Sequence, residues 1–280
     1  VGSDALLELR SIGVNRVSFG VQSFQDRHLA TLGRVHDAES ARNAVGLARA
    51  AGFRSINTDL IFGIPGQSIE DWRADLEATI GLAPEHVSGY GLTYEEGTLF
   101  HSWRSTETIR PASEDEEAEM FTEAAGALTR AGYEHYEISN YALPGHACRH
   151  NLTYWRRRMY LGIGAGAHSF APTPLHGLRF ANARSPQLYM DLIDQKGQAV
   201  VTDERLEQEQ AIGEFLFLGL RLLEGISRDG FEELFGMPPD ESRPALGWLV
   251  EAGLLEREET RIRLTTKGLL QADSVFASLL

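Results

Sequence analysis

Two polar side chains stand where a parallel α/β sheet would present them to a ligand. Gln22 closes a strand-like run over residues 16–21, and Asp59 lies inside the apolar run SINTDLIF at residues 55–62. A carboxylate among isoleucine, leucine and phenylalanine side chains is costly unless it is paired or bound to a ligand. Two interpretations of Asp59 therefore stay open. It either contacts a ligand, or it caps a helix or pairs with an arginine such as Arg34.

A second group of candidate residues lies in the segment HACRHNLTYW, residues 146–155. An imidazole can ligate haem iron, and flat aromatic side chains can stack on a porphyrin. One interpretation of the segment is therefore a porphyrin contact through His150, Tyr154 and Trp155. The alternative is that these aromatic side chains are packing residues and that His150 hydrogen-bonds to the backbone. Cys148 is the one cysteine of the chain, so it excludes an intrachain disulfide and cannot hold an iron–sulfur cluster by itself.

Alternating helix and strand patterns position the first group. Strands are expected over residues 16–21, 55–62 and 86–94, with helices over about 25–33, 38–51 and 69–82. Strands separated by helices of this length indicate βαβ units and a parallel sheet. Active sites of parallel barrels form at the carboxyl ends of the strands, where Gln22 and Asp59 are expected. No Gly-x-Gly-x-x-Gly follows an early strand, which argues against a dinucleotide-binding fold.

A change of composition near residue 200 predicts two domains, residues 1–200 and 201–280. A capping box at Ser113 and Glu116 begins a helix over 113–131, and the stretch 133–185 is expected to be irregular. The second domain shows helical patterns, then a hairpin, then a closing helix, an order typical of a winged helix; the expected ranges are 206–223, 228–235, 241–252, 254–264 and 266–279. Acidic residues outnumber basic ones there, so we do not expect it to bind DNA.

The charge of the whole chain excludes some classes of partner. The 280 residues carry a formal net charge of −14, and 42% of them are hydrophobic. A field of that sign repels nucleic acid and anionic lipid, so a neutral, cationic or enclosed ligand fits better. No apolar run reaches the ~18 residues of a membrane span, and the first residues do not resemble a signal peptide. With a single cysteine, these features predict a cytoplasmic protein.

The motifs, taken in order, resemble a known family. The runs GVNRVSFGVQSF, LGRVH, INTDLIFGIPGQ and EHVSGYGLTYEEGT resemble the radical S-adenosylmethionine family of oxygen-independent coproporphyrinogen III oxidase. Two later runs, EISNYALPGHACRHNLTYW and YLGIGAGAHS, resemble one branch in particular, the HemW-type haem chaperones. The C-terminal runs LGLRLLEGI and LVEAGLLE also resemble that branch, so the likeness extends over essentially the whole chain.

This resemblance implies a fold and a set of ligand contacts. The expected fold is α/β, a partial (β/α)6 radical S-adenosylmethionine barrel that is N-terminally truncated, with a C-terminal winged-helix-like module. By resemblance, Gln22 contacts the nucleoside of S-adenosylmethionine, Arg34 pairs with its methionyl carboxylate, and Asp59 hydrogen-bonds its ribose. A guanidinium pairs bidentately with a carboxylate, so the role implied for Arg34 is chemically sound.

The resemblance implies haem as a second ligand. His150, Tyr154 and Trp155 are the implied contacts, with His150 as the possible iron ligand. Haem or another porphyrin and proteins that accept haem are then the expected partners.

One implied feature is missing from the sequence. The family holds a [4Fe–4S] cluster with three cysteines at Cys-x3-Cys-x2-Cys spacing, and these 280 residues lack that motif. We therefore expect a truncated chain that does not bind the cluster by itself and whose first strand is an unpaired edge. Three functions stay open: a haem chaperone that binds and transfers haem, an oxygen-independent coproporphyrinogen III oxidase of porphyrin biosynthesis, or an inactive remnant.

Overall fold

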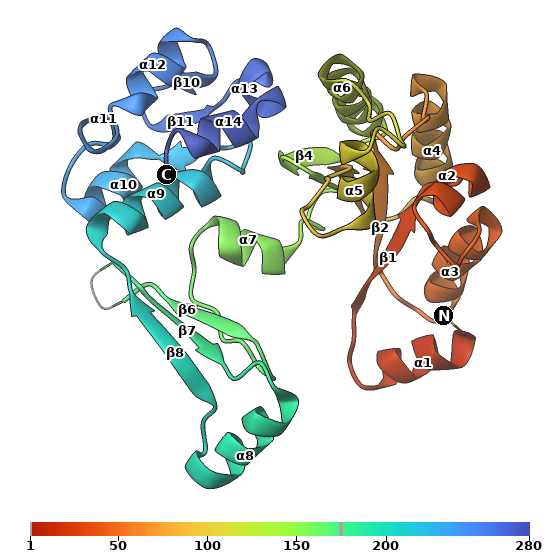
Figure 1. Ribbon diagram of the computed structural model, residues 1–280, viewed down its shortest axis with the longest axis horizontal. Helices are drawn as coiled ribbons and strands as arrows, with labels where there is room; N and C mark the ends of the chain where they lie inside the picture. The colour runs from red at the N-terminus through yellow and green to blue at the C-terminus, as the bar shows by residue number, and fades with distance from the viewer. Residues whose placement is uncertain (1, 174–175) are drawn as a thin grey trace. The chain divides into compact units, whose positions relative to one another are not determined.

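The computed structural model describes residues 2–173 and 176–280, and it divides the chain into two compact units (Figure 1). The first unit is Val1–Ala147 and the second is Cys148–Leu280. The domain boundary expected near residue 200 lies within the second unit, where a strand begins at Val200. That boundary stays a prediction.

A five-stranded sheet organises the first unit, in the order β1-β2-β3-β5-β4. The first three strands run parallel, as the alternating pattern predicts, and the last two are antiparallel. The sheet does not close, which agrees with a partial barrel, and β1 lies at its edge as expected. The strands are β1 (Arg16–Gln22), β2 (Ser55–Phe62), β3 (His86–Gly91), β4 (Glu134–Glu137) and β5 (Asn140–Ala142).

In the described part of this unit, residues 2–147, six helices accompany the sheet: α1 (Ser3–Ser11), α2 (Asp26–Thr31), α3 (Ala38–Ala50), α4 (Ile69–Leu82), α5 (Leu99–Ser105) and α6 (Glu114–Arg130). The capping box expected at Ser113 and Glu116 is present at the start of α6. A second capping box, Ser68 with Asp71, begins α4. Each box satisfies backbone N–H groups that the first helical turn leaves without a partner.

The helix-facing side of the sheet forms the hydrophobic core of this unit. Successive side chains of a strand point to opposite faces, so alternate residues of β1, β2 and β3 reach the helices. Val21, Leu60 and Val87 belong to this set and are buried with residues of α4 and α6. Trp72 of α4 is fully buried, and its indole Nε1 donates to the carbonyl of Met120 in α6 at 2.8 Å. The opposite face is therefore free to carry polar side chains.

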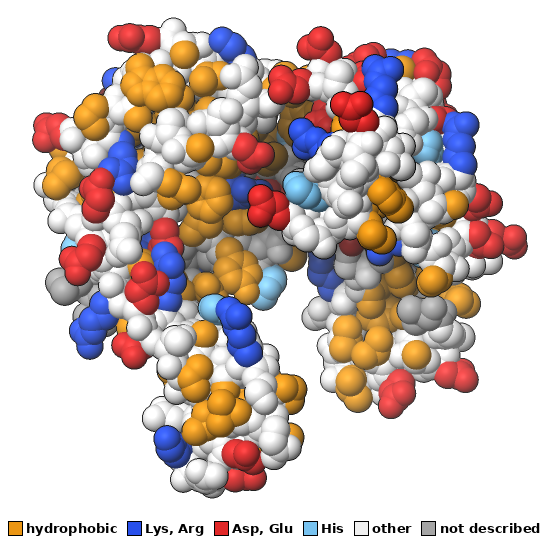
Figure 2. All heavy atoms as spheres, viewed as in Figure 1, with side chains coloured by type: hydrophobic (Ala, Val, Ile, Leu, Met, Phe, Trp, Pro, Cys, Tyr) orange, Lys and Arg blue, Asp and Glu red, His pale blue; other side chains and the backbone are white. Residues whose placement is uncertain are grey.

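The second unit begins with α7 (Arg149–Trp155) and a three-stranded antiparallel sheet of β6 (His168–Ala171), β7 (Leu178–Asn182) and β8 (Val200–Arg205). The expectation that 133–185 is irregular is therefore wrong, since β4, β5, α7, β6 and β7 all fall in it. The helix α8 (Pro186–Lys196) has no buried residue, and Figure 2 shows hydrophobic side chains gathered along it.

The C-terminal part of this unit has the expected winged-helix-like order. Its helices are α9 (Gln208–Gly219), α10 (Arg228–Phe235), α11 (Pro239–Ser242) and α12 (Ala245–Glu251), and its small sheet is β9 (Ile226–Ser227), β10 (Leu255–Arg257) and β11 (Arg261–Leu264). The single closing helix expected over 266–279 is instead two, α13 (Thr266–Leu270) and α14 (Ala272–Ala277), because Gln271 leaves helical dihedrals. Within residues 2–173 and 176–280, no helix is long and apolar enough to cross a membrane.

Candidate functional site

The face of the first sheet that points away from the core is lined by polar side chains. The parallel register places Ser18 beside Asn57, and Asp59 beside Ser88. Ser88 in turn stands opposite Asn140 of β5. Polar side chains on one face of a sheet are costly as a packed core but suit a polar ligand, because a ligand satisfies their hydrogen bonds. This polar face, defined by Ser18, Asn57, Asp59, His86, Ser88 and Asn140, is the first candidate site.

Asp59 lies at the centre of the polar face and is half-buried. Its Oδ2 accepts a hydrogen bond from Ser18 Oγ at 2.9 Å, and its Oδ1 accepts one from Asn57 Nδ2 at 2.7 Å. No ion pair joins Asp59 to Arg34 and no helix cap uses it, over the part of the chain that the structure describes. The structural alternatives considered for Asp59 therefore do not account for it. Its carboxylate is held by two neighbouring donors and keeps acceptor capacity for a ligand.

Gln22 ends β1 in a backbone conformation that only a few non-glycine residues adopt. Its φ is +68°, and the register between β1 and β2 shifts between Phe19 and Gln22. Left-handed backbone at a non-glycine residue costs of order 1 kcal/mol and clusters at ligand sites. The side chain turns back over Gly20, where a Cβ would lie 2.7 Å from Gln22 Nε2. The missing side chain at Gly20 therefore leaves room for the amide of Gln22.

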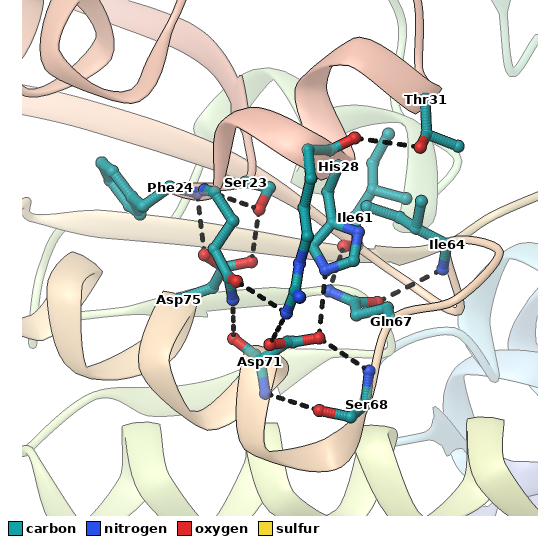
Figure 3. A network of polar contacts seen from close by, with 12 residues as sticks. Ser23, Phe24, His28, Thr31, Ile61, Ile64, Gln67, Ser68, Asp71 and Asp75 are labelled. Carbon is teal, nitrogen blue, oxygen red and sulfur yellow. Dashed lines mark hydrogen bonds and ion pairs between the residues drawn. The ribbon is translucent and has the colours of Figure 1, made fainter.

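Buried hydrogen bonds hold the turn that follows Gln22 (Figure 3). Asp75 of α4 is fully buried; its Oδ2 accepts from Ser23 Oγ at 2.7 Å and its Oδ1 from the backbone N–H of Phe24 at 2.7 Å. Burial is the main influence on this carboxyl and raises its pKa, although the two hydrogen bonds oppose that shift. Helix α4 thus fixes the backbone at the end of β1.

A second acid of α4 anchors the helix after that turn. Asp71 accepts from the backbone N–H of Ser68 at 3.0 Å, contacts His28 Nε2 at 3.2 Å and pairs with Arg27 (Figure 3). Burial acts to raise the pKa of Asp71, but the Ser68 backbone, His28 and Arg27 outweigh it and lower the pKa to about 2. These contacts hold α2 against α4, and so they fix the position of the segment between Gln22 and Arg34.

Arg34 lies on the surface, in the loop between α2 and α3. The structure gives it no ion pair or side-chain hydrogen bond within residues 2–173 and 176–280, and this includes Gln22 and Asp59. The loop itself is tied to the end of β1, because His36 Nε2 lies 3.2 Å from the carbonyl oxygen of Val21. Arg34 therefore sits on a loop that is tied to the end of the strand carrying Gln22.

The aromatic segment forms a second candidate site in the other unit. Helix α7 brings two of the predicted residues together: the rings of His150 and Tyr154 lie 4.8 Å apart, edge to face. The row of rings extends beyond Tyr154: the ring centroids of Tyr154 and Tyr160 lie 4.5 Å apart, and those of Tyr160 and Phe170 lie 6.2 Å apart. His150 is exposed at the open end of this aromatic row, with its imidazole accessible to a ligand.

Trp155 lies apart from the aromatic row. Arg221, which follows α9, stacks over the indole of Trp155 at 4.5 Å, and the indole Nε1 is buried without a hydrogen-bond partner among the described residues. Cys148 precedes α7, and its Sγ lies 3.4 Å from Asn151 Oδ1. The structure thus joins His150 with Tyr154 and places Trp155 in a cation–π contact. A Cβ on Gly162 would collide with the backbone of His168, whereas the Cβ position of Gly164 is open space.

Sequence reasoning did not identify several residues of these sites. Asn57, His86 and Tyr136 support Asp59, and Asp75 supports the turn after Gln22. Alternating polar residues in His86–Gly91 were a usable signal for the polar face. The role of Asp75 had no local signal, because its partners lie 51 and 52 residues away in the sequence.

Comparison with known proteins decides the family. Over 281 residues, 100% of this chain and 73% of the relative, the sequence is 36% identical to "Heme chaperone HemW" of Bacillus subtilis. The Escherichia coli "Heme chaperone HemW" is 37% identical over 98% of this chain and 71% of its own length. The chain belongs to the HemW family. Its expected relation to the radical S-adenosylmethionine proteins is thereby confirmed.

Domain and structure comparisons agree with this assignment. The Radical SAM superfamily model matches residues 3–78 of this HemW-family chain, and the HemN C-terminal domain model matches residues 206–270. A structure titled "Coproporphyrinogen III oxidase (HemN) from Escherichia coli is a Radical SAM enzyme" matches with a TM-score of 0.78 and 23% identity, over 100% of this chain and 67% of that one. At that identity the likeness shows the fold.

Membership of the radical SAM superfamily implies S-adenosylmethionine and a [4Fe–4S] cluster. The polar face fits S-adenosylmethionine, because the carboxylate of Asp59 and the amide of Gln22, which has room over Gly20, suit a nucleoside with hydroxyl groups. The cluster does not fit these residues. The sequence holds one cysteine, and no group of three His, Cys, Asp or Glu residues in the described ranges is placed to hold a metal.

Proposed function

We propose that this HemW-family chain is a haem chaperone, which binds haem on its second unit and passes it to an acceptor protein. We propose further that the polar face of the first unit binds S-adenosylmethionine. The whole-chain similarity to the Bacillus subtilis and Escherichia coli haem chaperones carries the proposal. The acceptor is a haem-requiring protein, and the place of transfer is the cytoplasm.

The aromatic row supports the haem half of the proposal. An exposed imidazole can ligate haem iron, and His150 stands at the end of a series of packed rings that continues through Tyr154 and Tyr160. Aromatic side chains present flat apolar area, which suits the face of a porphyrin. Bound haem would therefore be held by one iron ligand and by ring contacts, with Trp155 on the same helix.

Replacing His150 with alanine should weaken haem binding by at least about tenfold, the effect of losing ~1.4 kcal/mol of ligation. Titration of the purified chain with ferric haem, followed at the Soret band, measures the affinity. The matched control is His101→Ala, which removes a histidine from α5 of the other unit. Equal affinities for wild type and His150→Ala would contradict an iron ligand at His150.

The geometry of the polar face supports the S-adenosylmethionine half. Asp59 can accept hydrogen bonds from a ribose diol, and the amide of Gln22 can reach a nucleoside from the neighbouring strand, where Gln22 pairs in register with Leu60. S-adenosylmethionine, when bound, would supply the adenosyl and methionyl groups on which the chemistry of the radical S-adenosylmethionine family depends. The residues of this chain bind and orient the nucleoside.

Replacing Gly20 with alanine should reduce affinity for S-adenosylhomocysteine severalfold with little change in stability. The new Cβ would displace Gln22 Nε2, the flexible end of a side chain, while alanine is tolerated in a strand. Isothermal titration calorimetry measures the affinity, and thermal unfolding measures the stability. Unchanged affinity in the folded variant would argue that the Gln22 amide does not contact the ligand.

The alternative of a coproporphyrinogen III oxidase is not proposed for this chain. The oxidase named in the structural comparison is 23% identical, and oxidation in its family depends on a cluster that these residues cannot ligate. Haem binding and transfer need no cluster ligand from these 280 residues. The haem chaperone is therefore the function that the residues present can perform.

A further inference from the structure

A chain of hydrogen bonds crosses the sheet behind Asp59. Asn57 Nδ2 donates to Asp59 Oδ1 at 2.7 Å, and Asn57 Oδ1 lies 2.6 Å from His86 Nδ1. His86 Nε2 lies 2.8 Å from the hydroxyl of Tyr136. The chain therefore joins β2, β3 and β4 and ends at the carboxylate of the proposed ribose contact.

The carboxylate fixes the direction of every bond in this chain. A carboxylate only accepts, so the group of Asn57 that faces Asp59 is the N–H₂ and the group that faces His86 is the carbonyl. The carbonyl also only accepts, so His86 Nδ1 carries the proton. Nε2 then accepts from the hydroxyl of Tyr136. Only one tautomer of His86 satisfies all three contacts.

His86 is suited to hold that single tautomer. Its side chain is 1% exposed, and burial, with smaller effects of Arg16 and His146, lowers its pKa to about 3. The ring is therefore neutral at physiological pH, with one donor and one acceptor. Its edge-to-face contact with Tyr136, with ring centroids 5.7 Å apart, restricts its rotation.

We propose that His86 is a positioning residue, which orients Asn57 so that Asp59 is held in place for a ligand that carries a vicinal diol. Ser18 and Asn57 each occupy one oxygen of Asp59 from the protein side. Both oxygens then keep a lone pair for the diol. This inference rests on the proposed S-adenosylmethionine site and names the residue that organises it. An acceptor whose position is fixed before binding avoids the entropic cost of ordering it.

A purely structural role for His86 is the competing explanation, and His135 provides the matched control. His135 is half-buried, burial lowers its pKa, and its Nε2 hydrogen-bonds the carbonyl of Ile138 at 3.0 Å. Its ring stacks on Tyr141 at 4.2 Å, in the core on the other face of the sheet. Loss of His135 should therefore reduce stability without disturbing Asp59.

The experiment compares four variants of the 280-residue chain by calorimetric titration with S-adenosylhomocysteine. His86→Leu removes the donor to Asn57 and should lower affinity about tenfold, the upper end of the effect of one neutral hydrogen bond. His86→Asn keeps a donor near the position of Nδ1 and should stay within about threefold of wild type. His135→Leu should keep wild-type affinity, and Asp59→Asn should lose most binding.

A spectroscopic readout keeps the proposal testable if His86→Leu does not fold. The side-chain amide protons of Asn57 should exchange slowly with solvent in wild type and faster in His86→Asn and Tyr136→Phe, as measured by ¹H–¹⁵N NMR. Affinity that is unchanged in His86→Leu but lost in Asp59→Asn overturns the role of His86 and leaves the ribose site standing. No binding by wild type, or equal binding by Asp59→Asn, overturns the proposed site and this inference together. Equal losses in His86→Leu and His135→Leu overturn the positioning role alone.

Discussion

Replacing Asp75 with alanine should lower the free energy of unfolding of the first unit by about 3 kcal/mol. The change leaves the hydroxyl of Ser23 and the backbone N–H of Phe24 buried without an acceptor. A hydrogen bond to a charged group contributes about 1.5–3 kcal/mol, so two of them set an upper bound near 6 kcal/mol. Burial of the carboxylate, which raises its pKa, offsets part of that sum. The net loss of unfolding free energy is therefore expected at about half of that upper bound.

Urea unfolding followed by tryptophan fluorescence measures this loss, and Asp75→Asn is the matched variant. The asparagine oxygen can still accept from the Phe24 N–H, while no charge is buried, so we expect a loss of about 1 kcal/mol or less. The alanine variant should also weaken S-adenosylhomocysteine binding, because the turn that fixes the backbone of Gln22 loosens. If Asp75→Ala unfolds at the same urea concentration as wild type, the network does not hold the turn.

Acidification from pH 6.5 to 4.5 should destabilise the first unit through His86 by about 2 kcal/mol. The pKa of His86 is about 3 in the folded chain, against 6.5 for an ordinary histidine. Between these values the unfolded chain binds a proton that the folded chain does not, so stability rises with pH in this window. The contribution is complete above pH 6.5 and is lost as the pH falls toward 3. Each pH unit in the window is worth at most about 1.4 kcal/mol.

The variant His86→Asn isolates this effect, because it removes the titrating ring and leaves the other acids in place. Unfolding measured from pH 4.5 to 7.5 should give a flatter profile for the variant than for wild type. Asp71 destabilises in the same direction only below about pH 4, because its pKa is lowered to about 2. Asp75 acts in the opposite direction, since its pKa is raised. Identical profiles for the two proteins would mean that His86 is not buried in its neutral form.

Much of the first unit was predictable because its elements are long and periodic. The strands expected over 16–21 and 55–62 differ by at most one residue from β1 and β2, and the helix expected over 69–82 matches α4. The stretch 133–185 was not predictable in the same way, because its strands have three to five residues and carry too little alternation. Helix α5 has no buried residue, so no apolar stripe marked it.

The candidate site was predictable where a residue breaks a local pattern and not where it depends on pairing. Asp59 stood out as a carboxylate in an apolar run, and Gln22 as the end of a strand. The partners of Asp59 depend on the register of β1 and β3 against β2, which follows only from the folded sheet. For Arg34, no local pattern in the sequence indicated a role; the role was implied only by the resemblance, and in the structure its side chain lies on the surface.

The most direct measurement of the central claim is a Soret titration of the 280-residue chain with ferric haem, run in parallel with metal-free protoporphyrin IX. If the chain binds haem through an iron ligand at His150, the titration should saturate at one haem per chain and shift the Soret band. Haem should also bind more tightly than the metal-free ring. A linear, unsaturable absorbance increase with no band shift would contradict the claim that this chain binds haem.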